Sequence, residues 1–173
     1  MTSAPTSLRT KHVSVQRTIV VDQPLDTVFR YLSDFTTTTE WDPGTVRTER
    51  QSGNGGVGTT YRNTSRFLGR TVHLTYIVEE FVDKQRVRLR ARHNTVTAVD
   101  TMTFRTAAGG TQVDYTADFI FTGAIRLLTP MLKPALERLA TRAKTGMRAA
   151  LDRPWHREDG GIPHHLFKTR WRA

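Results

Sequence analysis

Three side chains of this sequence, Asp100, Tyr76 and His93, have the types and positions to take part in acid-base chemistry. Asp100 stands among apolar residues, and a carboxylate is costly to bury unless it is hydrogen-bonded or neutralised. Desolvation would favour its protonated form, which could donate a hydrogen bond to a ligand carbonyl or act as a general acid. The alternatives are a structural acid satisfied by water, or a slip in strand register that turns Asp100 outward.

These residues belong to an antiparallel meander that we expect between Thr59 and Phe121, after a first strand at His12 to Val21. Pro24 begins a short helix that runs to about Ser33, and a second short helix or loop follows it. Four two-residue turns separate the strands of the meander, at Leu68-Gly69, Asp83-Lys84, Asn94-Thr95 and Gly109-Gly110.

The turns fix the register, and each count brings the same kinds of residue to one face. Counting from Asn94-Thr95 pairs Leu89 with Asp100. Counting from Gly109-Gly110 pairs Asp100 with Phe119, and Phe104 with Tyr115. The neighbours expected for Asp100 on this face therefore carry no charge.

The outer face carries a row of arginines between threonines. The Asp83-Lys84 turn pairs Tyr76 with Ala91 inside and leaves Glu79 opposite Arg88 outside. Because the cross-strand acids Glu79, Asp114 and Asp118 balance this row, we expect a solvated face and no basic binding patch.

The inner face mixes apolar and polar side chains, with too many polar groups for a dry core. Such a face predicts a cavity in which a few polar groups orient an apolar ligand, although aromatic packing alone would also explain the tyrosines. His93 lies about 13 Å along the strand from the level of Asp100, beside a turn, which favours a rim position over a catalytic dyad. The strand residues expected to contact a ligand are Tyr61, Asn63, Ser65, Phe67, Leu74, Tyr76, Leu89, Met102, Phe104, Tyr115 and Phe119.

The segment Ala124 to Leu151 repeats apolar residues at three- and four-residue steps, which predicts a helix with one apolar face. Thr129-Pro130 resembles a helix start, so Ala124 to Leu128 would form a separate turn. We expect this helix to cover the curved sheet and to contact the ligand through Leu132, Leu136 and Leu139.

Length and composition predict one domain at residues 12–151, a flexible start at 1–11, and a basic, aromatic tail at 152–173. The formal net charge is +10, yet residues 13–123 hold 13 Lys and Arg against 12 Asp and Glu. The excess positive charge sits on the last helix and the tails, so we expect no nucleic-acid partner and at most weak membrane-surface contact through the helix back and tail.

With no cysteine and no ordered histidine cluster, no metal site or cofactor is expected. The polar start predicts a cytoplasmic protein.

Four stretches carry a resemblance to a known family: VSVQRTIVVDQPLDTVFRYLSDF at 13–35, EWDPG at 40–44, GGVGTTYR at 55–62, and DTMTFRTAAGGTQVDYTADFIFTG at 100–123. Residues 12 to 151 resemble the polyketide cyclase/dehydrase and lipid-transport proteins of the START-like (SRPBCC) superfamily. The resemblance implies an α+β helix-grip fold, in which a curved antiparallel sheet of about seven strands wraps a long C-terminal helix. These motifs specify a fold better than a function.

Members of that superfamily bind hydrophobic molecules, and a minority cyclise, aromatise or dehydrate polyketides. The resemblance thus implies binding of a lipid-, sterol- or polyketide-like molecule between sheet and helix. The alternative is a polyketide cyclase, aromatase or dehydratase that uses Asp100, Tyr76 and His93 as acid-base groups. The ligand and the choice between monomer and homodimer stay open, since the exposed first strand could pair with a second copy.

Overall fold

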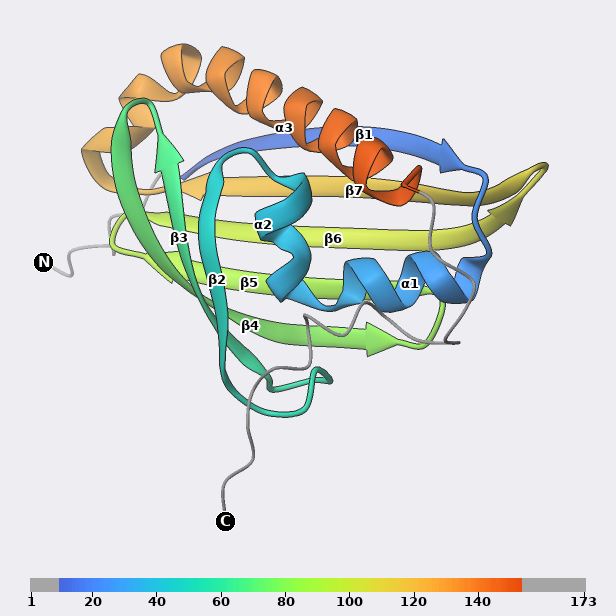
Figure 1. Ribbon diagram of the computed structural model, residues 1–173. Coiled ribbons are helices and arrows are strands. Elements are labelled where there is room, and N and C mark those ends of the chain that lie inside the picture. The colour runs from blue at the N-terminus through green and yellow to red at the C-terminus, as the bar shows by residue number, and fades with distance from the viewer. Residues whose placement is uncertain (1–9, 154–173) are drawn as a thin grey trace, which may run out of the picture.

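The protein is an α+β structure in which one antiparallel sheet curls around a long helix (Figure 1). The computed structural model describes residues 10–153, so most of the predicted tail at 152–173 lies outside the described residues. The seven strands lie in the order β1-β7-β6-β5-β4-β3-β2, which confirms the predicted fold. Their bounds are β1 Lys11–Val21, β2 Thr45–Ser52, β3 Thr60–Phe67, β4 Arg70–Val82, β5 Arg86–His93, β6 Val96–Ala107 and β7 Gly110–Phe121.

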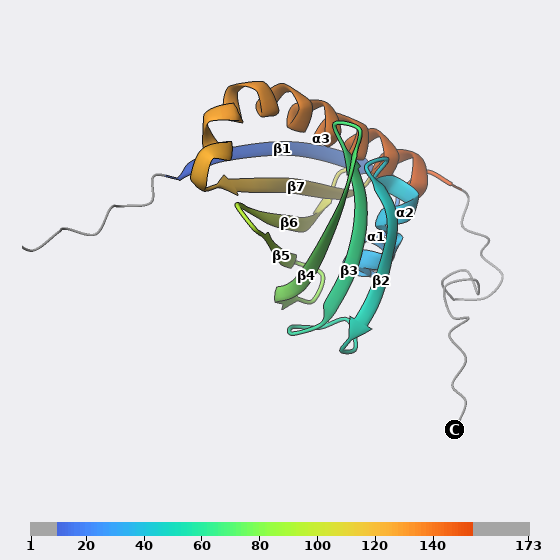
Figure 2. The ribbon, with the colours of Figure 1, turned by 90° about the vertical axis from the view of Figure 1, so that its left-hand side faces the viewer.

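Helices close both the side and one end of this curved sheet. In the view of Figure 2 the sheet curves from β1 and β7 round to β3 and β2, and α3 lies next to the edge strand β1 and the short helix α2. Helix α1 covers the end at which β1 finishes (Figure 1). The helical segments are α1 Leu25–Ser33, η1 Phe35–Thr37, α2 Thr38–Trp41, η2 Gly123–Leu128 and α3 Thr129–Leu151.

The long helix begins where its sequence predicts, after a separate turn that the structure shows as a 3₁₀ helix. The expected cap is wrong, however. Thr129 is already helical, and its hydroxyl donates to the carbonyl of Arg126 at 2.6 Å, one turn earlier. The residue before the helix, Leu128, supplies no side-chain cap and is 51% exposed, outside the apolar stripe that packs on the sheet.

Two turns have the predicted register. His93 faces Val96 across Asn94-Thr95, and Asp100 pairs with Leu89. The β3–β4 turn is Leu68-Gly69, as expected.

The β4–β5 hairpin keeps the predicted inner pairs by a different route. Tyr76 does pair with Ala91, but Glu80 rather than Glu79 faces Arg88. The turn contains one residue more than expected, and a bulge at Glu79 restores the register beyond it. Because of the bulge, the residues of β4 that were predicted to point inward, such as Tyr76 and Val78, still do so.

The β6–β7 register expected from Gly109-Gly110 is wrong by two residues. Phe104 pairs with Val113 instead of Tyr115, and Asp100 pairs with Ala117 instead of Phe119. The turn is therefore Ala108-Gly109. Gly110 is the first residue of β7, where a Cβ would stand 2.1 Å from the carbonyl oxygen of Val21, so this glycine serves a close strand contact. A shift of two residues preserves the faces but changes the neighbours.

Several outer arginines are paired with acids on the same face, as predicted, whereas Arg66 and Arg92 form no ion pair with a described residue. Glu79 accepts from Arg90 at 2.5 Å and lies 3.5 Å from Arg88, while Asp114 lies 3.4 Å from Arg105. Such exposed pairs each contribute little to stability but neutralise part of the charge of this face. Within residues 10–153, no helix combines the length and the apolar composition that crossing a bilayer requires.

Candidate functional site

Asp100 is a buried carboxyl on the inner face of β6, with 7% of its surface exposed. The hydroxyl of Tyr115 on β7 donates to it at 2.7 Å. Burial raises the pKa of Asp100 to about 6, against the opposing effect of hydrogen bonds from Tyr115 and Tyr76. The charges that act on it, Asp42 and Asp118, are both acids and raise the pKa further. Asp100 is therefore poised to be protonated in mildly acidic solution.

The two tyrosines that face Asp100 stay protonated and act as donors. Burial and the negative charge of Asp100 raise the pKa of both Tyr76 and Tyr115 well above 10. The contact between Tyr115 and Asp100 depends on the observed register, because Met102 pairs with Tyr115 and Asp100 lies diagonally across from it. The predicted register placed Tyr115 four residues away, so sequence reasoning missed this hydrogen bond.

A second carboxyl, the half-buried Asp42, lies at the turn between α2 and β2 and had no predicted role. Burial raises its pKa, although the backbone N–H of Gly44 and the hydroxyl of Thr45 donate to it at 2.9 and 2.8 Å. The preceding residue, Trp41, packs its ring edge against Tyr115 with centroids 6.2 Å apart. The stretch EWDPG contained both residues, but nothing in its composition indicated that they approach Asp100.

The polar residues predicted on β3 are engaged by the protein itself. Asn63 is 2% exposed and donates to Thr48 at 2.8 Å, and Ser65 donates to Asn63 at 2.5 Å. These bonds leave little capacity for a ligand at Asn63. The hydroxyl of Tyr61 is buried and makes no hydrogen bond of good geometry within the described residues.

The predicted ligand-contact residues divide into two halves of the interior. One half is packed: it joins α1 and the last turns of α3 in one apolar cluster, and its predicted members Tyr61, Tyr76, Leu89, Met102 and Phe104 are buried. Leu136 is buried in the second cluster, nearer the start of α3.

The other half keeps accessible surface although its side chains share the inner face or the apolar side of α3. An inward side chain can be accessible only toward an internal space or an open end of the arc. The half-buried residues are Ser65, Phe67, Leu74, Tyr115, Phe119, Leu132 and Leu139. They come from the end of β3, from β4 and β7, and from the first half of α3. Phe67, Phe119 and Leu132 pack against the second cluster, and Leu74 packs against the first.

His93 is the last residue of β5, beside the β5–β6 turn, and is exposed, at the predicted rim position. It pairs with Val96 while Asp100 pairs with Leu89, so the two are several residues apart along the sheet. They do not form a dyad. Asp100 and Tyr115 form the acid-base contact that the structure contains.

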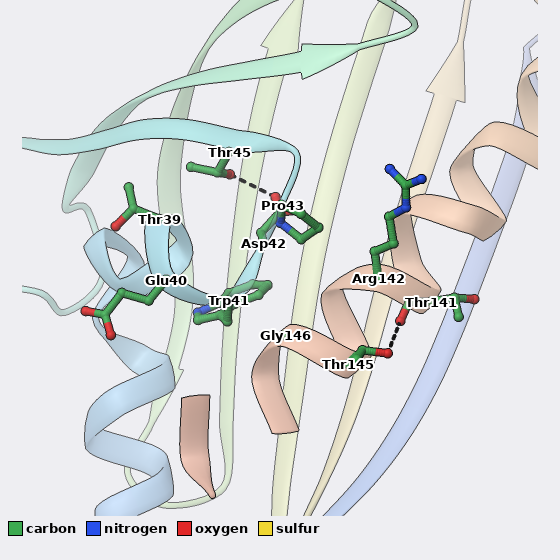
Figure 3. A pocket seen from close by; sticks show the side chains of 10 residues that line it. All are labelled: Thr39, Glu40, Trp41, Asp42, Pro43, Thr45, Thr141, Arg142, Thr145 and Gly146. Atoms are coloured by element: carbon green, nitrogen blue, oxygen red, sulfur yellow. Dashed lines mark hydrogen bonds between the residues drawn. The ribbon is translucent and has the colours of Figure 1, made fainter. Parts of the chain in front are cut away.

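A hollow of about 540 Å³ lies at the flank of α3, where the α2–β2 turn meets the helix (Figure 3). Trp41 and Asp42 face Arg142 and Thr145 across it. Its lining combines threonines and charged residues with Trp41 and Pro43, so it is mixed in character. Here Gly146 allows close packing, since a Cβ would stand 1.9 Å from the Trp41 carbonyl oxygen.

Comparison with solved structures finds proteins that share this fold. The chain is similar to the ZhuI aromatase/cyclase from Streptomyces sp. R1128, with TM-score 0.69, 20% identity, and coverage of 89% of this chain and 100% of that one. It is also similar to a START superfamily protein from Mycobacterium smegmatis, with TM-score 0.66, 14% identity, and coverage of 82% and 97%. At these identities the likeness shows the fold alone.

Sequence comparison gives the family. A search of curated protein sequences finds no significant match. The family profile described as "Polyketide cyclase / dehydrase and lipid transport" matches residues 12–153, which is most of the chain. The chain therefore belongs to the polyketide cyclase/dehydrase and lipid transport family.

Proposed function

We propose that the protein binds a neutral hydrophobic molecule, polycyclic or lipid-like, in the accessible half of the compartment between the sheet and α3. The observation that carries this proposal is the Asp100–Tyr115 hydrogen bond of 2.7 Å beside half-buried apolar side chains. Phe119, Leu74 and Leu132 supply apolar contact, and Asp100 with Tyr115 supplies the polar anchor. This combination suits a ligand that is mostly apolar and carries an oxygen at its inner end.

The anchor selects against a negative charge at that position. Both charges that act on Asp100 are acids, and the inward Arg17 is held by Glu137 at 2.7 Å. A carboxylate placed beside Asp100 would meet a like charge in a poorly solvated site. A ketone or hydroxyl would instead accept a hydrogen bond from protonated Asp100 or from a tyrosine hydroxyl.

A matched pair of tricyclic probes tests this. The neutral ketone 9-fluorenone should bind, whereas fluorene-9-carboxylate should bind at least tenfold more weakly, as measured by isothermal titration calorimetry. Equal affinity for the two would contradict the anchor. Failure of both to bind, together with no small molecule retained in native mass spectrometry of the purified protein, would contradict ligand binding itself.

A cyclase or aromatase reaction is the second candidate, favoured by the same contact. Asp100 and a tyrosine hydroxyl within hydrogen-bond distance form a pair that can move a proton to and from a carbonyl oxygen during ring closure. The aromatase/cyclase ZhuI shares the fold. The test is cyclisation of a poly-β-ketone substrate followed by liquid chromatography. Turnover lost in Asp100→Asn but kept in the outer-face variant Asp114→Asn would support catalysis, and no acceleration over buffer would exclude it.

A further inference from the structure

We propose that the end of the arc where β1 begins and β7 finishes docks onto an anionic membrane surface. This end comprises residues 10–14, the β3–β4 turn, the β5–β6 turn, and the segment 120–134 that contains η2 and the start of α3. Antiparallel order brings these segments together, and the backbone N–H of Thr122 donates to Thr95 at 2.8 Å. The surface is called the open end below.

The open end exposes large apolar side chains. Met131 is 76% exposed, Leu127 71%, Leu68 64% and Leu128 51%. Every leucine or methionine that the described part of the chain exposes this strongly lies here; its other exposed large apolar residues are valines and Ile77. Leu127 lies in the last turn of η2 and Met131 in the first turn of α3, four residues farther on. Side chains of this size, gathered at one end, mark an interaction surface.

Leu68 shows that this exposure is built into the backbone. It occupies a turn position with φ of +49°, where Gly or Asn normally stands. A leucine there costs about 1 kcal/mol of backbone strain and points an apolar side chain into solvent. Neither the backbone strain nor the exposed apolar side chain helps the hairpin to fold, whereas an exposed leucine at a turn suits insertion into an apolar layer.

The charge at the open end identifies the partner. Residues 10–14, 64–73, 91–98 and 120–134 contain no Asp or Glu. Their Lys and Arg residues, none of which forms an ion pair with a described residue, are Lys11, Arg66, Arg70, Arg92, Arg126 and Lys133. His12 lies 3.0 Å from Asp118 of β7. At the opposite end the bases are paired, as in Lys84 with Asp26 at 3.0 Å and Arg86 with Glu80 at 3.5 Å. Positive charge is therefore free where the apolar side chains are exposed.

Only a partner that is both anionic and apolar satisfies both features. A second copy of the chain would bring like charges together, and residues 154–173 carry four Lys and Arg against two acids. Nucleic acid would interact with the basic side chains but would leave the exposed leucines in contact with water. An anionic bilayer attracts Lys and Arg through its headgroups and accepts leucine and methionine below them. Docked in this way, the half-buried Phe67, Phe119 and Leu132 would lie next to the bilayer, from which a hydrophobic ligand could enter.

Vesicle co-sedimentation of the full chain tests the surface. We expect binding to vesicles of 70% phosphatidylcholine and 30% phosphatidylserine, and at least tenfold weaker binding to pure phosphatidylcholine. Leu127→Ser with Met131→Ser should weaken binding to the anionic vesicles at least tenfold. The matched control, Val57→Ser with Val82→Ser, removes exposed apolar residues elsewhere and should bind as the wild type does.

Charge variants distinguish the open end from the exposed arginines farther along α3, Arg138 and Arg148. Arg126→Gln with Lys133→Gln should weaken binding several-fold more than Arg138→Gln with Arg148→Gln. The proposal is overturned by no binding to anionic vesicles at low salt, or by equal loss in the two charge pairs. It is also overturned if a duplex DNA binds more tightly than vesicles and the serine variants leave that binding unchanged. These outcomes do not depend on whether 9-fluorenone binds.

Discussion

At the scale of single residues, burial and hydrogen bonding act on Asp100 in opposite directions. Burial disfavours the charged carboxylate and raises its pKa. The donors Tyr115 and Tyr76 favour the ionised form and bring its pKa back to about 6. The residue can therefore offer a proton or accept one near neutral pH, which a fully exposed aspartate cannot do.

This pKa predicts how stability depends on pH. In the folded protein the pKa of about 6 exceeds the ordinary value of 3.8, so the folded state holds the proton more tightly. The stabilisation is complete below pH 4 and is lost as the pH rises through 6, by up to about 3 kcal/mol. Asp100→Asn removes this dependence. Urea unfolding at pH 4 and pH 8 should show the variant gaining stability relative to wild type at the higher pH, and an unchanged difference would contradict the buried acid.

The same pKa predicts the pH dependence of binding. Protonated Asp100 donates to a ketone, so the affinity for 9-fluorenone, which does not titrate, should fall as the pH rises from 5 to 8. In Asp100→Asn the affinity should be nearly independent of pH. Calorimetric titrations of both proteins across this range make the comparison, and an identical pH profile for the two would remove Asp100 from the site.

The hydrogen bond from Tyr115 has a measurable effect on its acceptor. Because it lowers the pKa of Asp100, Tyr115→Phe should raise that pKa above 6. Tyr61→Phe is the matched control, since the Tyr61 hydroxyl makes no well-formed hydrogen bond in the described residues. Carbon-detected NMR titration of the Asp100 carboxyl reports the value. A pKa that falls or stays constant in Tyr115→Phe would show that this bond does not form in solution.

At the scale of elements, alternation and turns predicted the faces of the sheet better than the contacts between strands. The glycine pair 109-110 offered two positions for one turn, and only the closeness of Gly110 to β1 decides between them. That contact lies between strands far apart in the sequence, which no local pattern contains. The error moved Tyr115 away from Asp100, while the faces, set by a period of two residues, survived it.

The β4–β5 hairpin also shows that turns predict the faces better than the exact contacts between strands. An extra turn residue and a bulge cancel, so the inner pairs were predicted correctly for the wrong reason. Asp42 and Trp41 could not be assigned from sequence either, because α2 meets Tyr115 through tertiary packing alone. The start of α3 was predictable because proline and helical periodicity are local signals.

The packing of α3 on α2 makes a prediction of its own. Gly146→Ala would place a Cβ 1.9 Å from the Trp41 carbonyl oxygen, which forces the helix away from the α2–β2 turn. We expect a loss of about 1 to 3 kcal/mol in unfolding free energy, despite the better helix propensity of alanine. The exposed neighbour in Thr145→Ala should change stability by less than about 0.5 kcal/mol. Chemical denaturation measures both, and equal effects would show that the close contact is absent.

At the scale of the whole molecule, the two ends of the arc differ in packing and in charge. The end under α1 is filled by the larger apolar cluster, and its described bases are ion-paired. The open end has half-buried apolar residues inside, and exposed leucines and free basic side chains outside. Under the proposed function, the ligand would lie in the accessible half of the compartment and enter from the open end.

The central claim is that the accessible half of the compartment holds the ligand. It is tested most directly by a substitution that fills this half with a larger side chain. Leu74→Trp adds a large ring to the half-buried inner face of β4, and Ile77→Trp adds the same ring to the outer face of the same strand, where Ile77 is 42% exposed. With folding verified by circular dichroism, calorimetry should show that Leu74→Trp weakens 9-fluorenone binding at least tenfold while Ile77→Trp binds as the wild type does. Unchanged affinity in a folded Leu74→Trp would contradict the claim.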